Sequence, residues 1–173
     1  VKFQQICTDY TLDVAWRQIL GLELPKEEIP YFEEQVACWI KSVTSLRILF
    51  RVAVKFSPGF KAREYVISKI EERIGELLEQ GPDNKSTLSG MVFASDDEEG
   101  TQTGKKLSRE EIIDNALILI FAGSETSANT LTNAMLFLGL HPSAWDKLAK
   151  EQETIMTKEG DVMTMANLDA NNA

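Results

Sequence analysis

The sequence has few cysteines and histidines, and its charge balance is acidic. Its 173 residues include 2 cysteines and 1 histidine, and its formal net charge is −9. Nucleic-acid binders depend on clustered Lys and Arg that release counterions from phosphates, so the acidic balance argues against that class. Cys7 and Cys38 lack CxxC spacing and a histidine partner. Free buried thiols in a reducing compartment are therefore favoured over a metal site or a disulfide.

Long apolar runs are also missing. The longest, Ala116 to Gly123, is far shorter than the roughly 20 residues that span a bilayer. No basic-then-apolar leader opens the chain, which begins at Val1 and ends in a polar run, so both ends resemble cuts. We expect an intracellular protein, with attachment to the endoplasmic reticulum membrane if an N-terminal anchor precedes Val1.

Helical spacing of apolar residues dominates what is present. With 43% hydrophobic and 26% charged residues, the composition is that of one globular domain, and residues 1–173 are assigned to it. No period-2 pattern competes, so an all-α fold is predicted. Three early helices are expected: one around Leu12–Ile19 closed by Gly21, one around Ile29–Ile40, and one after the breaker Pro58-Gly59.

The segment from Gly81 to Lys106 differs in composition from its surroundings. It is rich in Gly, Ser, Asp and Thr, and it contains the acidic run 96–99. Such a segment has little apolar surface with which to order itself. We predict a flexible, exposed connector over residues 81–106.

The clearest helix start lies immediately after this connector. Ser108 and Glu111 form a capping box, and Leu107 and Ile112 are spaced as a hydrophobic staple. The helix can continue until Pro142 disfavours a helical residue before it, which gives roughly 30 residues and a central place in the fold. A further amphipathic helix follows Pro142.

The middle of this long helix has an unusual chemical character. Gly123 costs roughly 1 kcal/mol against Ala in a helix interior, and the hydroxyl of Thr126 can bond back to the carbonyl of Ala122, which loosens a helix. Glu125 adds an ionisable group in a segment that the flanking apolar residues predict to be buried. A carboxyl beside a hydroxyl can deliver protons.

The run Ala122-Gly123-Ser124-Glu125-Thr126-Ser127 resembles the central-helix motif of the cytochrome P450 family. Residues 57–64 and the Leu140-His141-Pro142 turn are also similar to that family, most closely to its sterol and retinoid hydroxylase branch. The resemblance implies a central part of the P450 fold, with helices E to G in Val1–Gln80, helix I in Ser108–Leu140 and helix J in Ser143–Thr157.

The resemblance also implies a function and a set of partners. A haem cofactor would lie against Ala122, Gly123 and Thr126. Thr126 is expected to hydrogen-bond the oxygen ligand or its water, and Glu125 is expected to relay protons. The complete protein would insert one oxygen atom from O2 into a lipophilic small molecule, with electrons from an NADPH-dependent reductase or a ferredoxin.

The sequence departs from the family in what it does not contain. It has no Glu-x-x-Arg, and neither Cys7 nor Cys38 stands in a loop like the one that supplies the family's thiolate ligand. We expect the haem-ligating cysteine to be absent from this chain, which alone is then inactive. No metal ligand is assigned to any residue.

Two questions stay open at the level of sequence. The stretch from Trp39 to Phe60 lacks acidic residues and interleaves basic with apolar ones, which is typical of membrane contact or of side chains extended over an ordinary helix pair. His141 is interpreted as a turn residue. The whole chain could instead be a non-enzymatic helical interaction domain that uses the same amphipathic faces.

Overall fold

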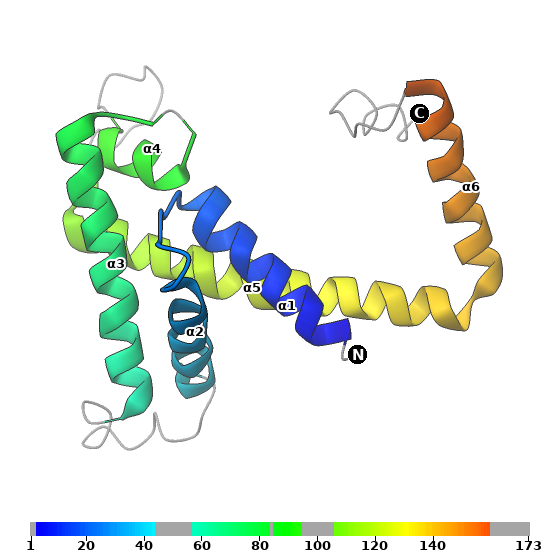
Figure 1. Ribbon diagram of the computed structural model, residues 1–173, viewed down its shortest axis with the longest axis horizontal. Helices are drawn as coiled ribbons and strands as arrows, with labels where there is room; N and C mark the ends of the chain where they lie inside the picture. The colour runs from blue at the N-terminus through cyan, green and yellow to red at the C-terminus, as the bar shows by residue number, and fades with distance from the viewer. Residues whose placement is uncertain (1–2, 44–56, 84, 95–105, 160–173) are drawn as a thin grey trace. The chain divides into compact units, whose positions relative to one another are not determined.

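The computed structural model describes residues 3–43, 57–83, 85–94 and 106–159. Within these ranges every regular element is a helix, which confirms the predicted all-α class (Figure 1). The chain divides into two compact units, Val1–Asn129 and Thr130–Ala173. Helix α5 contains the boundary between them.

The first helix is longer than predicted and ends in a wider turn. Helix α1 covers Phe3–Asp13, and η1 continues it as a π-helix over Val14–Ile19. Gly21 follows with φ of 67°, in the left-handed region, as predicted for the closing residue. A Cβ built on Gly21 would also lie 2.6 Å from the Cβ of Ser86, so this position needs glycine for space as well as conformation.

Helices α2 (Ile29–Val43) and α3 (Pro58–Gln80) form the main helix pair of the first unit. Ser57 caps α3 by accepting a hydrogen bond from the N–H of Phe60, and Pro58 occupies the first turn, where a missing N–H costs nothing. Pro58-Gly59 was predicted to be a breaker that precedes the helix, and it forms the first turn of the helix instead. The fully buried side chains between the elements of this unit include Phe32, Val36, Ala62, Val66 and Ile70.

The predicted connector contains a short helix. Helix α4 covers Thr87–Phe93, and Leu88, Ser89 and Val92 are buried. Ser86 caps it by accepting a hydrogen bond from the N–H of Ser89 at 3.1 Å. The expectation of an exposed connector is wrong for this stretch, because two apolar residues spaced four apart are enough to fix one turn of helix on the core. Residues 84 and 95–105 lie outside the described residues.

Helix α5 covers Arg109–Leu140 and begins as predicted. The N–H of Ser108 donates to Glu111 Oε2 at 2.7 Å, and the N–H of Glu111 donates to Ser108 Oγ at 3.2 Å, which is the reciprocal pair of a capping box. From Ile112 to Ile120 one face of α5 is buried in the core of the first unit. The long helix thus has an anchored N-terminal half.

The second unit holds the end of α5 and helix α6 (Pro142–Glu159), which follows a turn at His141. The backbone N–H of His141 donates to Phe137 O at 3.0 Å, in agreement with its assignment as a turn residue. Apolar side chains in this unit are largely exposed; they are Leu131, Met135, Leu136, Phe137, Leu140, Trp145, Leu148 and Met156.

The proposed membrane-contact stretch falls mostly on residues 44–56, outside the described residues. At its start, Trp39 is buried against the core and its ring lies 6.3 Å from that of Phe121. Among the described helices, none combines the length and the apolar content needed to cross a bilayer. The membrane-contact hypothesis stays a prediction.

Candidate functional site

The candidate site is the turn of α5 that runs from Ile120 to Thr126. The helix is continuous through it. Thr126 Oγ1 donates to the carbonyl oxygen of Ala122 at 2.6 Å, which confirms the back-bond predicted from sequence. Ser124 Oγ makes the same contact with the carbonyl of Ile120 at 2.6 Å. Two side-chain hydroxyls of this turn therefore donate hydrogen bonds to the backbone carbonyls of Ile120 and Ala122.

A third carbonyl of the turn accepts a hydrogen bond from a hydroxyl on another helix. Thr11 of α1 donates through Oγ1 to the carbonyl oxygen of Ser124 at 2.9 Å, and both residues are buried. Carbonyls that accept a second bond tilt away from the helix axis and lengthen their helical bonds. The carbonyls of Ile120, Ala122 and Ser124 each accept such an extra bond, within a little more than one turn of the helix. The helix α5 is nevertheless continuous there.

The two sides of the turn differ in exposure. Ser124 and Ala128 are buried, whereas Ala122, Glu125 and Thr126 are exposed. A Cβ built on Gly123 would meet nothing within 4 Å. The sequence-based expectation of a buried Glu125 is therefore wrong for this chain. The reason is rotational: residues 124 and 128 lie on the covered side of α5, and residue 125 is about 100° away from residue 124 around the axis.

The open side of the turn carries small side chains beside one hydroxyl and one carboxyl. Ala122 and Gly123 leave the backbone accessible to a flat group. Thr126 Oγ1 uses its proton on Ala122 O, so its lone pairs can accept a hydrogen bond from a donor outside the helix. Glu125, one residue earlier, is a carboxyl in contact with solvent. The arrangement can therefore hold a proton donor against an uncovered helix surface.

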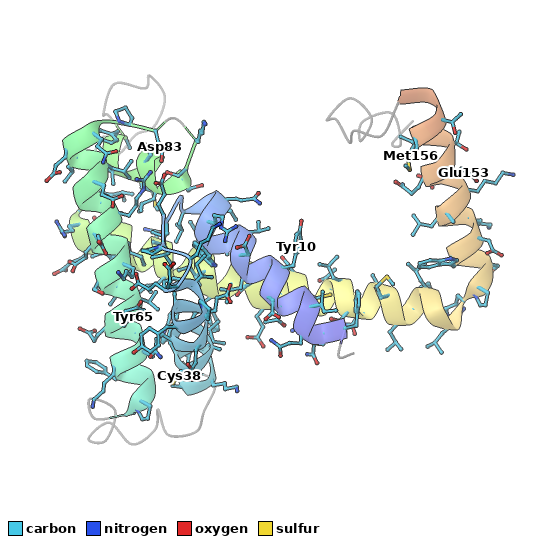
Figure 2. All side chains as sticks on the ribbon, viewed as in Figure 1. Tyr10, Cys38, Tyr65, Asp83, Glu153 and Met156 are labelled. Carbon is cyan, nitrogen blue, oxygen red and sulfur yellow. The ribbon has the colours of Figure 1, made fainter. Side chains whose placement is uncertain are left out.

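Two other polar clusters of the first unit serve the fold. In one, Lys69 Nζ lies 2.8 Å from Glu28 Oε1, and Tyr65, on the side of α3 that faces α2 in Figure 2, donates to the same oxygen. These hydrogen bonds hold the pKa of Glu28 below its ordinary value. Burial, with the bond to Glu28, raises the pKa of Tyr65 to about 12. The cluster links α2 to α3.

The second cluster ties α3 to the segment before α4. Asp83 accepts hydrogen bonds from the N–H groups of Lys85 and Ser86, from the Ser86 hydroxyl and from Arg73. Burial alone would raise the pKa of Asp83, but these four bonds outweigh it, and the pKa lies well below its ordinary value. Neither cluster adjoins the α5 turn. Within the described residues no three His, Cys, Asp or Glu side chains are grouped to hold a metal ion.

Sequence reasoning located Ala122, Gly123, Glu125 and Thr126 but missed Thr11 and the buried role of Ser124. Thr11 lies in no motif, and its acceptor is 113 positions away. One signal was available, since Cys7 and Thr11 are spaced four apart and define a face of small side chains on α1. That spacing indicates a close helix crossing without naming the partner.

Comparison with known proteins identifies the family. A family model for cytochrome P450 matches residues 7–170. Cytochrome P450 26B1 of Xenopus tropicalis is 34% identical over 146 residues, covering 82% of this chain and 27% of the relative. Cytochrome P450 720B2 of Pinus taeda is 26% identical over 162 residues, covering 94% of this chain and 31% of the relative.

A solved structure, retinoic acid bound cyanobacterial CYP120A1, superposes with a TM-score of 0.69 at 21% identity, over 98% of this chain and 36% of that chain. The fold is thus that of an all-α protein built around one long helix. The chain belongs to the cytochrome P450 family. It spans about a third or less of the length of the curated relatives named above.

Membership of this family implies a haem cofactor. The residues present fit one face of such a group, because the open surface at Ala122 and Gly123 has no side chain that would hold a flat ring away from the backbone. Cys7 is buried on α1 and Cys38 is partly buried on α2. Neither cysteine belongs to α5.

Proposed function

We propose that the protein containing this chain is a haem-dependent monooxygenase, and that the α5 turn from Ala122 to Thr126 is its oxygen-activating element. The observation that carries the proposal is the combination of an uncovered backbone at Ala122 and Gly123 with the oriented Thr126 hydroxyl. Haem, when bound, supplies the binding and reduction of dioxygen. The ring would lie against Ala122, Gly123 and Thr126.

The chain's own residues supply the proton. The Thr126 hydroxyl donates to Ala122 O, which fixes its oxygen, and a hydroxyl oxygen in this position can accept a hydrogen bond from a water molecule. The Glu125 carboxyl reaches solvent and can take up a proton and pass it to that water. The pair would thus deliver protons at Thr126 Oγ1.

The substrate class is inferred from the relatives. The solved structure to which this chain is similar contains retinoic acid, an elongated apolar molecule with one carboxylate. We propose a lipophilic small molecule of the retinoid or sterol kind, oxidised with electrons from a reductase. The family match favours this activity over that of a non-enzymatic helical interaction domain.

An isotope experiment tests the proposed reaction. The haem-loaded full-length protein is given a reductase, NADPH and retinoic acid under 18O2, and the products are analysed by mass spectrometry. One 18O atom per oxidised product is expected, with none when the label is supplied as H2 18O. Oxidation without 18O from O2, or no oxidation of any retinoid or sterol tested, would count against the proposal.

A further inference from the structure

The contact between α1 and the candidate turn involves a buried hydroxyl and a backbone carbonyl. Figure 1 shows α1 crossing α5 near the middle of the long helix. On the crossing side, Cys7 and Thr11 of α1 and Ser124 and Ala128 of α5 are all buried. The opposite side of α1 is exposed, and Figure 2 shows Tyr10 projecting from it. Thr11 Oγ1 lies 2.9 Å from the carbonyl oxygen of Ser124.

This hydroxyl has one proton and three carbonyl acceptors within reach, those of Ser124 at 2.9 Å, Cys7 at 2.9 Å and Thr8 at 3.3 Å. The carbonyl of Cys7, one turn earlier in α1, is also 2.9 Å away. That second contact is the ordinary back-bond of a helical threonine, which Thr8 makes to Gln4. The bond to Ser124 is the additional feature, because it joins two helices through buried residues. Without the Thr11 hydroxyl, the carbonyl of Ser124 would lose its hydrogen bond from α1.

The carbonyl that Thr11 holds lies directly before the proton-delivery pair. The Ser124 carbonyl carbon is bonded to the nitrogen of Glu125, so fixing this oxygen fixes the peptide plane that leads into Glu125. Two residues earlier, the Thr126 hydroxyl holds the peptide plane between Ala122 and Gly123. The turn is therefore held from its open side by its own Thr126 and from its buried side by Thr11.

We infer that Thr11 is a positioning residue for the α5 turn: its hydroxyl holds the Ser124 carbonyl and thereby sets the direction of Glu125 and Thr126. Thr11 itself touches no reacting group. The inference rests on the proposed function, since the consequence for protons arises only if Glu125 and Thr126 deliver them. The hydrogen bond and its effect on the turn can be measured independently of activity.

Three variants separate the hydroxyl from the rest of the side chain. Thr11→Val keeps the shape and removes the hydroxyl, and Thr11→Ser keeps the hydroxyl. Thr8→Val is the matched control, because it removes a helical back-bond from the same helix without a partner on α5. All are made in the haem-loaded full-length protein, beside Thr126→Ala as the reference for loss of proton delivery.

The first measurement is hydrogen exchange of peptides that span residues 120–130, followed by mass spectrometry. Thr11→Val should speed this exchange by about fivefold, the size expected for losing one buried neutral hydrogen bond. Thr11→Ser and Thr8→Val should exchange like the parent. Equal exchange in Thr11→Val and the parent would overturn the inference, as would the same acceleration in Thr8→Val.

The second measurement is coupling, expressed as product and hydrogen peroxide formed per NADPH consumed. Thr11→Val should lose coupling and release more peroxide while substrate affinity changes little, and Thr11→Ser should restore coupling. Normal coupling in Thr11→Val, with uncoupling in Thr126→Ala, would overturn the positioning role. Normal coupling in both variants would show that Glu125 and Thr126 do not deliver the protons, and would remove the positioning role with that part of the proposed function.

Discussion

At the scale of single residues, the hydrogen bond from Thr126 to the carbonyl of Ala122 is one that helical threonines commonly make. Thr154 and Thr157 of α6 bond to carbonyls four residues earlier, each at 2.7 Å, as Thr126 does to Ala122. The back-bond alone therefore does not mark a site. Thr126 is distinguished by its neighbours, since Gly123 and Ala122 leave the helix surface open beside its hydroxyl. Location, and not the bond itself, supports a chemical role.

Asp83 gives a prediction for stability and its pH dependence. Asp83→Asn should lower the free energy of unfolding by about 1–3 kcal/mol at pH 7, because the buried Arg73 loses one of its two charged acceptors and keeps Glu76. The folded pKa of Asp83 is lowered, so its contribution is complete above the ordinary value of 3.8 and is lost as the pH falls toward the folded pKa.

Urea unfolding at pH 7, 5 and 3 measures this difference. The gap between parent and Asp83→Asn should be equal at pH 7 and 5 and smaller at pH 3. Asp146→Asn on α6 is the control, since Asp146 is exposed and should leave the unfolding free energy unchanged at each pH. A gap that widens on acidification would contradict the sign of the pKa shift.

At the scale of helices, the local signals at the start of α5 were reliable, whereas the start of α1, the presence of α4 and the burial of Glu125 were not predicted correctly. The start of α5 was predictable because Ser108 and Glu111 satisfy each other within one turn. Helix α4 was not predictable, because residues 81–106 are polar on average and contain few apolar residues, among them Leu88 and Val92. Both are buried through contact with residues that are distant in the sequence. Glu125 was wrongly expected to be buried, because the spacing of apolar residues shows which side of a helix is apolar but not which side other elements cover.

Two glycines of α3 give opposite predictions for the same substitution. A Cβ at Gly59 would overlap the Cβ of Ser42 on α2, so Gly59→Ala should destabilise the chain by about 1–3 kcal/mol through overpacking. Gly75 has nothing within 4 Å of such a Cβ, and Gly75→Ala should stabilise by about 0.5–1 kcal/mol through helix propensity. Thermal unfolding of both variants checks the pair, and a gain for Gly59→Ala would contradict the close α2–α3 contact.

At the scale of the whole molecule, the chain is much shorter than the family members that it matches. The chain covers 27% of cytochrome P450 26B1 of Xenopus tropicalis and 36% of the solved retinoic acid complex. The fold class and the position of the motif were predictable, because both depend on helical periodicity and on a motif within one turn. The substrate was not, since specificity depends on side chains brought together from several parts of a protein.

The positions of the two cysteines give a prediction for the chain by itself. The 173-residue chain, mixed with haem, reduced and exposed to carbon monoxide, should show no thiolate-type Soret band. Cys7 is buried on α1 and Cys38 is partly buried on α2, away from the open side of the α5 turn. A stable thiolate band that disappears in Cys7→Ser or Cys38→Ser would show that a ligand has been overlooked.

The proton-delivery pair is tested most directly by the stoichiometry of turnover in the haem-loaded full-length protein. Product, hydrogen peroxide and NADPH consumed are measured for the parent, Thr126→Ala, Glu125→Gln and the control Thr154→Ala, which loses the same back-bond on an exposed helix. Alanine preserves the helix, so Thr126→Ala should still consume NADPH but release peroxide, with product falling about tenfold or more.

Glu125→Gln should slow turnover, because an amide keeps the size of the side chain but cannot relay protons. Thr154→Ala should match the parent in all three quantities. Parental coupling in Thr126→Ala together with a parental rate in Glu125→Gln would contradict the account, and the α5 turn would then be a helical scaffold that carries the motif without its chemistry.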